Sequence, residues 1–149
     1  MQLTPHFHLS ELTVSQTAAR RGIPNVPNAA MVAQLRRTAL RMEQVRAILG
    51  GKPILISSGY RSPAVNKAVR GSRTSAHMTG HAVDFTCPGY GSPYEVALKL
   101  SRELPDFDQL IQEFGQWVHV GFGPGQRNQL LTAAKVNGRT VYSPGILKP

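Results

Sequence analysis

The segment SAHMTGHAVDF, residues 75–85, places two histidines and an aspartate around a glycine. Imidazole nitrogens and carboxylate oxygens are common zinc ligands, so metal binding is the chemistry to consider. Two arrangements are open. His77 and His81 stand four positions apart and would share one face of a helix, as in helical zinc peptidases. Alternatively, Gly80 and the VDFT segment favour a loop that enters a strand, with His77 in the loop and Asp84 on the strand.

A third ligand is needed in either arrangement. A catalytic zinc takes three protein groups and keeps one position open for water. The other histidines of the chain are His6, His8 and His119. His119 lies between valines in WVHVGF, where a histidine adds little to packing, whereas His6 and His8 are expected at the surface. Spacing alone leaves the site undecided.

Several motifs together resemble one known family. SAHMTGHAVD fits the pattern Ser-x-His-x-x-Gly-x-Ala-x-Asp, WVHV supplies a later Trp-x-His, and SSGYRSP and FDQLIQEF stand in the matching order. With the leading SELTVSQTAARRGIPNVPN, they resemble D-Ala-D-Ala carboxypeptidase-like zinc peptidases of bacterial cell walls, which include phage L-alanyl-D-glutamate endolysins. The resemblance implies one zinc ion held by His77, Asp84 and His119. It leaves His81 on a variable position.

The general base requires a separate argument. In the family this residue is an acidic group or histidine a few positions before the last ligand, but here Gln116 cannot titrate. If FDQLIQE and WVHVGF form a hairpin with a three-residue loop, Glu113 faces Trp117 and Ile111 faces His119. Glu113 and His119 then project from one face, about 7–8 Å apart at the backbone. We therefore predict Glu113 as the catalytic base.

Four residues are candidates for contact with substrate. Arg61 in GYRSP is implied by the resemblance to contact substrate or to polarise the scissile carbonyl. Its guanidinium suits both roles, because it stays charged and presents a fork of donors to an oxyanion or carboxylate. Ser75 can hydrogen-bond substrate or order its loop. Tyr60 and Trp117 can line the cleft, although aromatic residues near a sheet often belong to the core.

The surrounding sequence predicts the elements that must position these groups. Apolar residues recur every three or four positions after Asn28 and predict one long helix, ended by Gly50-Gly51. Ser92-Pro93 begins a second helix, and Asn137-Gly138 predicts a hairpin turn. We expect an α+β fold, with helices packed against a small antiparallel sheet, as in the zinc D-Ala-D-Ala peptidase and hedgehog-like fold. Residues 10–21 are expected to form one capped helix or two short turns. The other expected helices are 29–49, 64–70 and 93–104, and the expected strands are 54–58, 81–86, 107–114, 117–122, 127–136 and 139–142.

Composition limits the classes of partner. The 149 residues suit one domain without a separate wall-binding domain, and hydrophobic residues make up 41%. Seventeen Lys and Arg against eight Asp and Glu give a net charge of +9, which favours an anionic partner such as the bacterial envelope. We expect no specific nucleic-acid binding, since aromatic residues are only 7% and no helix-turn-helix pattern occurs. One cysteine, Cys87, excludes an internal disulfide.

Together these features predict a monomeric zinc metallopeptidase that hydrolyses an amide bond of the peptidoglycan stem peptide. An L-Ala–D-Glu endopeptidase is favoured over a D-Ala-D-Ala carboxypeptidase. The N-terminus shows no signal peptide and no apolar run suggests a membrane span. We therefore expect a phage or prophage lysis enzyme, made in the cytoplasm and acting on the wall once the membrane is permeabilised. The alternative is a non-catalytic binding or structural component of a phage particle, which Gln116 favours.

Overall fold

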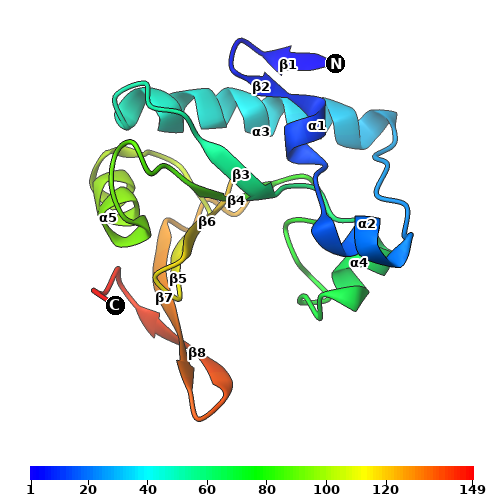
Figure 1. The fold of residues 1–149 in the computed structure, drawn as a ribbon. Helices are drawn as coiled ribbons and strands as arrows, with labels where there is room; N and C mark the ends of the chain where they lie inside the picture. The colour runs from blue at the N-terminus through cyan, green and yellow to red at the C-terminus, as the bar shows by residue number, and fades with distance from the viewer.

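Helices dominate the first half of the chain and strands the second half (Figure 1). The computed structural model describes residues 1–149. The α+β prediction is confirmed, and no helix combines the length and hydropathy that crossing a bilayer requires. The elements are β1 (Gln2–Thr4), β2 (Phe7–His8), α1 (Leu9–Leu12), α2 (Gln16–Arg21), α3 (Ala29–Ile48), β3 (Leu55–Ser58), α4 (Pro63–Ala68), β4 (Ala82–Thr86), α5 (Pro93–Glu103), β5 (Gln109–Glu113), β6 (Trp117–Gly121), β7 (Gln129–Val136) and β8 (Arg139–Pro144).

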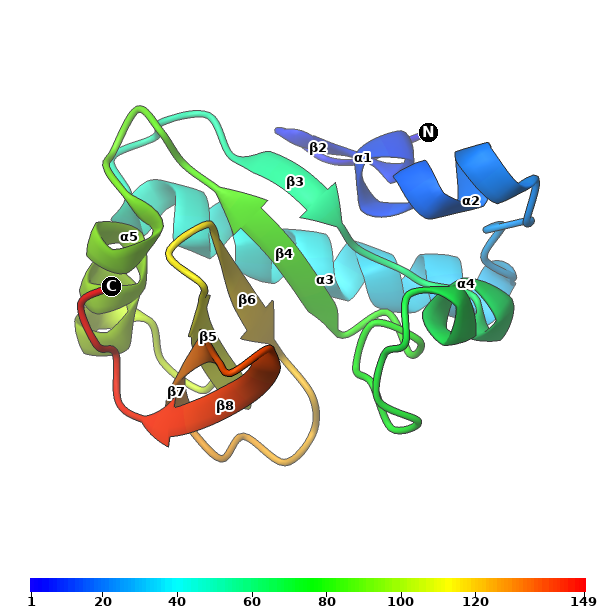
Figure 2. The same ribbon diagram turned by 60° about the horizontal axis from the view of Figure 1, so that its bottom comes forward.

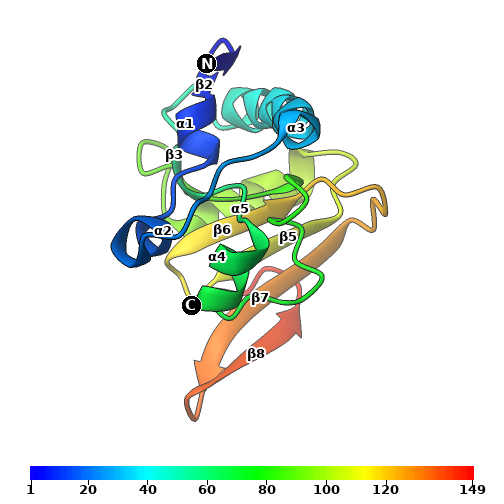
Figure 3. The same cartoon turned by 90° about the vertical axis from the view of Figure 1, so that its right-hand side faces the viewer.

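A six-stranded sheet forms the centre of the molecule, in the order β3-β4-β6-β5-β7-β8 (Figure 3). Four of its five strand pairs are antiparallel, as predicted, but β5 and β7 run parallel. The sheet is therefore mixed. The parallel pair arises because β7 does not pair with β6, the strand before it, and instead adds to the free side of β5.

One face of this sheet packs on helices. Figure 2 shows α3 passing behind β4 and β6. The apolar stripe predicted for the long helix is buried, and it joins side chains of α5 and alternate residues of the central strands in one core. The opposite face carries Asp84, His119 and Glu113 together with the apolar residues Ile111 and Ala133. The core residues that carry this packing are Leu35, Ala39, Met42, Val45, Val83, Phe85, Val96, Ala97, Leu100, Leu110, Val118 and Val120.

Capping side chains define the helix starts. Asn28 accepts a hydrogen bond from the backbone of Met31 at the start of α3, and Ser92 and Glu95 form a capping box at the start of α5. Of the two arrangements predicted for 10–21, one capped helix or two short turns, the structure is nearer the second: it forms two short helices, capped by His8 and Ser15. The small β1–β2 sheet that precedes them was not predicted, because its strands are only three and two residues long.

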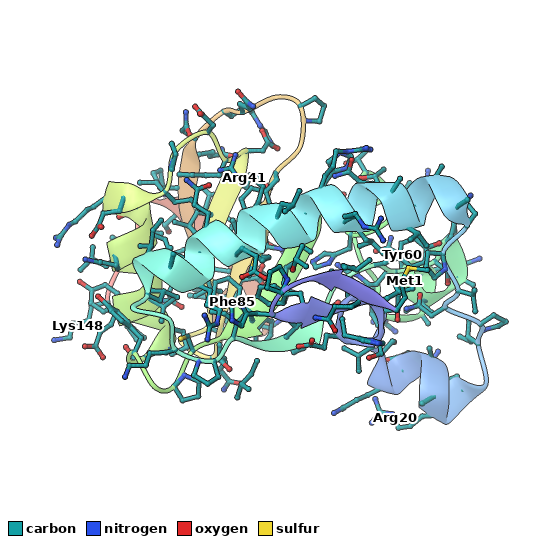
Figure 4. The ribbon with its side chains drawn as sticks, turned by 90° about the horizontal axis from the view of Figure 1, so that it is seen from above. Met1, Arg20, Arg41, Tyr60, Phe85 and Lys148 are labelled. Atoms are coloured by element: carbon teal, nitrogen blue, oxygen red, sulfur yellow. The ribbon has the colours of Figure 1, made fainter.

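The arginines of α3 are not all fully exposed. Arg41 is half-buried, lies over the ring of Phe122 at 4.8 Å, and donates to the carbonyl of Pro105. Figure 4 looks down on α3 and shows Arg41 at one side of the helix, with β1 and β2 at the other. Arg41 therefore ties α3 to the segment between α5 and β5, which helps hold the sheet on the helix.

Candidate metal centre

Three predicted ligands meet on the open face of the sheet. Asp84 on β4 and His119 on β6 are directly opposite in the antiparallel pair, and His77 comes from the turn that precedes β4. His119 Nδ1 lies 2.9 Å from Asp84 Oδ1, and His77 Nε2 lies 3.3 Å from the same oxygen. The two imidazoles approach within 3.2 Å. The loop-to-strand arrangement is thus the one that forms.

A backbone carbonyl orients His77. Its Nδ1 lies 2.7 Å from the carbonyl oxygen of Gly59, and because a carbonyl only accepts, Nδ1 carries the proton. The Nε2 lone pair of His77 therefore points toward Asp84 and His119. A partner of this kind on the far nitrogen of a ligating histidine is the usual way in which proteins fix its tautomer. The His77 side chain is only 2% exposed, so the ring has little freedom to turn.

These donors fit a zinc ion. Ligand atoms about 2.0–2.2 Å from a tetrahedral zinc lie about 3.3–3.6 Å from one another. The three distances of 2.9, 3.2 and 3.3 Å between the donor atoms come close to that spacing. Without a cation, lone pairs of two imidazoles and a carboxylate converge on one point with too few protons between them. Two neutral histidines and one carboxylate also leave a bound zinc with net positive charge.

The electrostatics of the three groups favour their ligating forms. Burial disfavours the charged form of Asp84, but the charges and hydrogen bonds of the two histidines hold the pKa of its carboxyl well below the usual range. Burial lowers the pKa of His77, which favours the neutral imidazole that a metal needs. Burial alone would also lower the pKa of His119, but the hydrogen bond and the charge of Asp84 outweigh this effect, so the pKa of His119 is raised. Metal and proton therefore compete at His119.

Glu113 lies beside this centre in the predicted register. Glu113 pairs with Trp117 and Ile111 with His119, across the three-residue loop 114–116. Side chains at Glu113, Trp117 and His119 therefore project from one face, as predicted. Burial raises the pKa of the Glu113 carboxyl, and the nearby charge of Asp84 raises it further. This carboxyl is half-buried and makes no salt bridge.

Arg61 and Ser75 lie at the other side of the centre. The Arg61 backbone donates to the carbonyl of His77, and its Nη2 lies 3.4 Å from Ser75 Oγ. Burial lowers the pKa of the guanidinium, whose Nε has no hydrogen-bond partner; nevertheless, an arginine keeps its charge. Ser75 Oγ also accepts from the backbone of His77 at 3.2 Å. Ser75 thus orders the loop that carries the metal ligand.

The remaining candidates take different positions. Trp117 is half-buried on the site face, stacked edge-on with Phe114 at 5.5 Å between ring centres. Tyr60 is only 7% exposed and belongs to the hydrophobic core, so its ring packs there instead of lining the cleft as predicted. His81 lines a separate polar hollow of about 250 Å³ beside Arg37 and cannot join the ligand set.

Two residues of the site were not found in the sequence. The carbonyl of Gly59 carries no side-chain signal, so its bond to His77 is visible only in the structure. Tyr142 projects from the site face as well, because it pairs with Ala133, which itself pairs with Glu113. The Asn-Gly turn predicts the pairing of Tyr142 with Ala133. The pairing of Ala133 with Glu113 depends on the parallel β5–β7 pair, which no local sequence pattern predicts.

Comparison with known proteins agrees with this geometry. A sequence profile described as Peptidase M15 matches residues 5–121, the part that contains all three ligands and Glu113. The chain is also 34% identical, over 93 residues, to a zinc D-Ala-D-Ala carboxypeptidase of Streptomyces albus G. That match covers 60% of this chain and 35% of the carboxypeptidase, so the chain spans about a third of its relative's length. On the extent of the profile match, the chain belongs to the Peptidase M15 family.

Proposed function

We propose that this protein is a zinc metallopeptidase that hydrolyses an amide bond of the peptidoglycan stem peptide. The observation that carries the proposal is the convergence of His77, Asp84 and His119, with donor atoms within 4.8 Å of one another, beside an unpaired carboxyl. Family membership supports the reaction class, and the relative from Streptomyces albus G supports the substrate class. When bound, zinc supplies Lewis acidity toward a peptide carbonyl and toward water.

The chain's own residues account for the proton transfers. Glu113 takes a proton from the attacking water, whose oxygen forms the new bond to the carbonyl carbon. As the C–N bond breaks, the same carboxyl gives that proton to the leaving nitrogen, so the products are a carboxylic acid and an amine. The raised pKa of Glu113 brings it closer to the range in which one group can do both. Arg61 supplies positive charge toward the oxygen that becomes negative.

We extend the proposal to the bond and the setting. The favoured bond is the L-Ala–D-Glu amide, and the favoured role is lysis of a bacterial cell from within by a phage or prophage enzyme that reaches the wall after membrane permeabilisation. The net charge of +9 supports binding to an anionic wall. A D-Ala-D-Ala carboxypeptidase uses the same ligand set, so the test must identify the bond.

The test is mass spectrometry of purified peptidoglycan fragments incubated with the zinc-loaded protein, with chelator, and with chelator followed by excess zinc. Chelator-sensitive products restored by zinc are expected. New fragments that begin with glutamate identify an endopeptidase, whereas loss of one alanine identifies a carboxypeptidase. Folded, zinc-loaded protein that binds the fragments and releases no product from several wall types would contradict the peptidase and favour the non-catalytic alternative, for which exposed Gln116 is the structural argument.

A further inference from the structure

The hairpin of β7 and β8 lies beyond the residues that the family profile matches, which end at 121. It projects from the body of the molecule in Figure 1. Register connects it to the candidate centre: Trp117 pairs with Glu113, Glu113 with Ala133, and Ala133 with Tyr142. Directly paired residues share a face, so this row runs across four strands on the side that carries the metal ligands.

Tyr142 is the outermost member of the row. Its backbone lies about 10 Å from that of Glu113, two strand spacings away, which a tyrosine and a glutamate side chain can bridge. Ala133 lies between them and is small and only 1% exposed, so neighbouring side chains cover it. Partial burial raises the pKa of the Tyr142 phenol, and the charges of Glu113 and Asp84 add to the effect. The residue is nevertheless 55% exposed, so its side chain can reach a bound molecule.

Lys135 occupies the next position on the same face of the hairpin. It pairs with Thr140, donates to Thr140 Oγ1 at 2.9 Å, and lies 5.5 Å from the centre of the Phe114 ring. Phe114 in turn packs on Trp117. Lys135 is exposed and takes part in no ion pair, so its ammonium group is available to an external anion. Val136, Arg139 and Val141 face the other side of the hairpin.

Charge decides what this surface can bind. Asp84 is neutralised by a bound zinc, whose open position the scissile carbonyl and the water need, and Glu113 repels a second carboxylate beside it. A substrate carboxylate away from the scissile bond must therefore be held by donors at the margin of the centre. Arg61 provides such donors on one side, and Lys135 with the Tyr142 hydroxyl provides them on the other. We propose that the Lys135–Tyr142 face of the β7–β8 hairpin is a subsite that binds a carboxylate of the substrate peptide. The inference rests on the proposed function and specifies its substrate.

Two carboxylates of a stem peptide can fill the subsite: the α-carboxyl of D-glutamate and the C-terminal carboxyl. The experiment therefore uses the synthetic peptide L-Ala-γ-D-Glu-L-Lys-D-Ala-D-Ala, in which the side-chain carboxyl of glutamate forms the amide with lysine and the α-carboxyl is free. It is used in three forms: unmodified, amidated at the glutamate α-carboxyl, and amidated at the C-terminus. Binding to the zinc-loaded protein is followed by the fluorescence of Trp117, the only tryptophan, and cleavage is followed separately by mass spectrometry. The carboxylate that occupies the subsite is the one whose conversion to an amide weakens binding.

Three variants locate the subsite. Lys135→Gln should weaken binding of the peptide with the free carboxylate about tenfold, since a charge-assisted contact is lost. Most of the difference in affinity between this peptide and its amidated form should then disappear. Tyr142→Phe should weaken binding of the same peptide about two- to fivefold, as expected for one hydrogen bond. Arg139→Gln is the matched control, because it removes the same charge from the same hairpin on the opposite face. It should leave the preference intact.

Equal effects of Lys135→Gln and Arg139→Gln would overturn the subsite, because they would reduce it to general charge attraction. A wild-type protein that binds acid and amide forms equally would overturn it too. The two proposals fail separately: charge-selective binding without cleavage contradicts the peptidase and leaves the subsite standing. Cleavage without charge-selective binding contradicts the subsite and leaves the peptidase standing.

Discussion

Glu113 is the only carboxylate at the centre that is free of both metal-ligand and ion-pair partners. Asp84 Oδ1 lies 2.9 Å from His119 Nδ1 and 3.3 Å from His77 Nε2, at the predicted metal position. Asp108, the next acid on the neighbouring segment, is held by Arg127 with Nε 2.8 Å from Oδ1. We therefore expect Glu113 to carry the proton transfers of the proposed hydrolysis, and we expect its substitution to separate catalysis from metal binding.

We expect Glu113→Gln to lower kcat about 10²- to 10⁴-fold, the usual contribution of a general acid or base. Zinc content, measured by atomic absorption, should stay at the wild-type level because the three ligands are untouched. Glu103→Gln is the matched control: this glutamate lies on α5, is paired with Lys99, and is far from the site face of the sheet. A Glu113→Gln enzyme that retains more than about a tenth of kcat would place the base elsewhere.

Asp84 tests the metal centre itself. Zinc should raise the melting temperature of the wild-type protein, because a ligand at 100 times its Kd stabilises the folded state by about 2.7 kcal/mol. Asp84→Ala removes one of three ligands and should abolish that rise, whereas Glu103→Ala should keep it. Differential scanning fluorimetry in chelator and in added zinc measures both. A rise of equal size in Asp84→Ala would mean that zinc binds somewhere else.

At the scale of elements, the end of β3 must lie against α1 for His77 to be held. A Cβ on Gly59 would stand 2.4 Å from the carbonyl oxygen of Leu12 and 2.9 Å from its Cα, both backbone atoms that cannot turn aside. The backbone of Tyr60 donates to the same carbonyl at 2.7 Å. Only glycine permits this approach, and the carbonyl of Gly59 is the one that orients His77.

Gly59→Ala should therefore affect metal binding at a distance from the ligands. We expect zinc affinity to fall about 10- to 100-fold, as for loss of other outer partners of ligating histidines. Overpacking should also lower the free energy of unfolding by about 1–3 kcal/mol. Competition with a chromophoric chelator measures the affinity. Gly89→Ala is the control, since a Cβ there meets only the flexible Lys52 side chain at 3.4–3.6 Å. Unchanged zinc affinity in Gly59→Ala would show that the Gly59 carbonyl does not contribute to metal binding.

The sequence predicts elements best where the signal is local. The stripe of α3, the Ser92 cap and the β5–β6 register follow from spacing and turn length, and the structure agrees with all three. The parallel β5–β7 pair could not be predicted, because consecutive strands more often pair with each other. For the site, spacing alone leaves the ligands undecided, and the family resemblance implies His77, Asp84 and His119. The contributions of Gly59 and Tyr142 depend on the tertiary fold and could not be predicted.

The segment that leads into β7 is held by one ion pair. Arg127 donates to both carboxylate oxygens of Asp108, at 2.8 and 2.9 Å, and its backbone donates to Oδ1 as well. These hydrogen bonds lower the pKa of Asp108 below its unfolded value. Because the folded-state pKa is depressed, the pair stabilises the fold above the ordinary carboxyl pKa, and this stabilisation is lost as the pH falls through the folded value.

Acid should therefore destabilise the wild-type protein more than Asp108→Asn. Chemical denaturation in chelator at pH 6, 4 and 3 compares the two, with zinc absent so that its release does not contribute. We expect the difference between their unfolding midpoints to shrink as the pH falls, since Asp108→Asn has no carboxyl to protonate at this position. A difference that stays constant across this range would show that the ion pair adds no pH-dependent stability.

At the scale of the whole molecule, we expect the net charge of +9 to attract the protein to an anionic wall independently of the metal centre. Attraction between exposed charges is screened by salt, with a Debye length of about 8 Å at 0.15 M and about 3 Å at 1 M. Binding to purified cell walls should thus fall several-fold between about 0.05 and 0.5 M NaCl, measured by sedimentation with the inactive Glu113→Gln variant so that the wall stays intact. Cleavage of a soluble, uncharged stem-peptide analogue should change much less, because its contacts lie within the half-buried centre. Wall binding that persists in high salt would mean that stem-peptide contacts, and not net charge, hold the protein on its substrate.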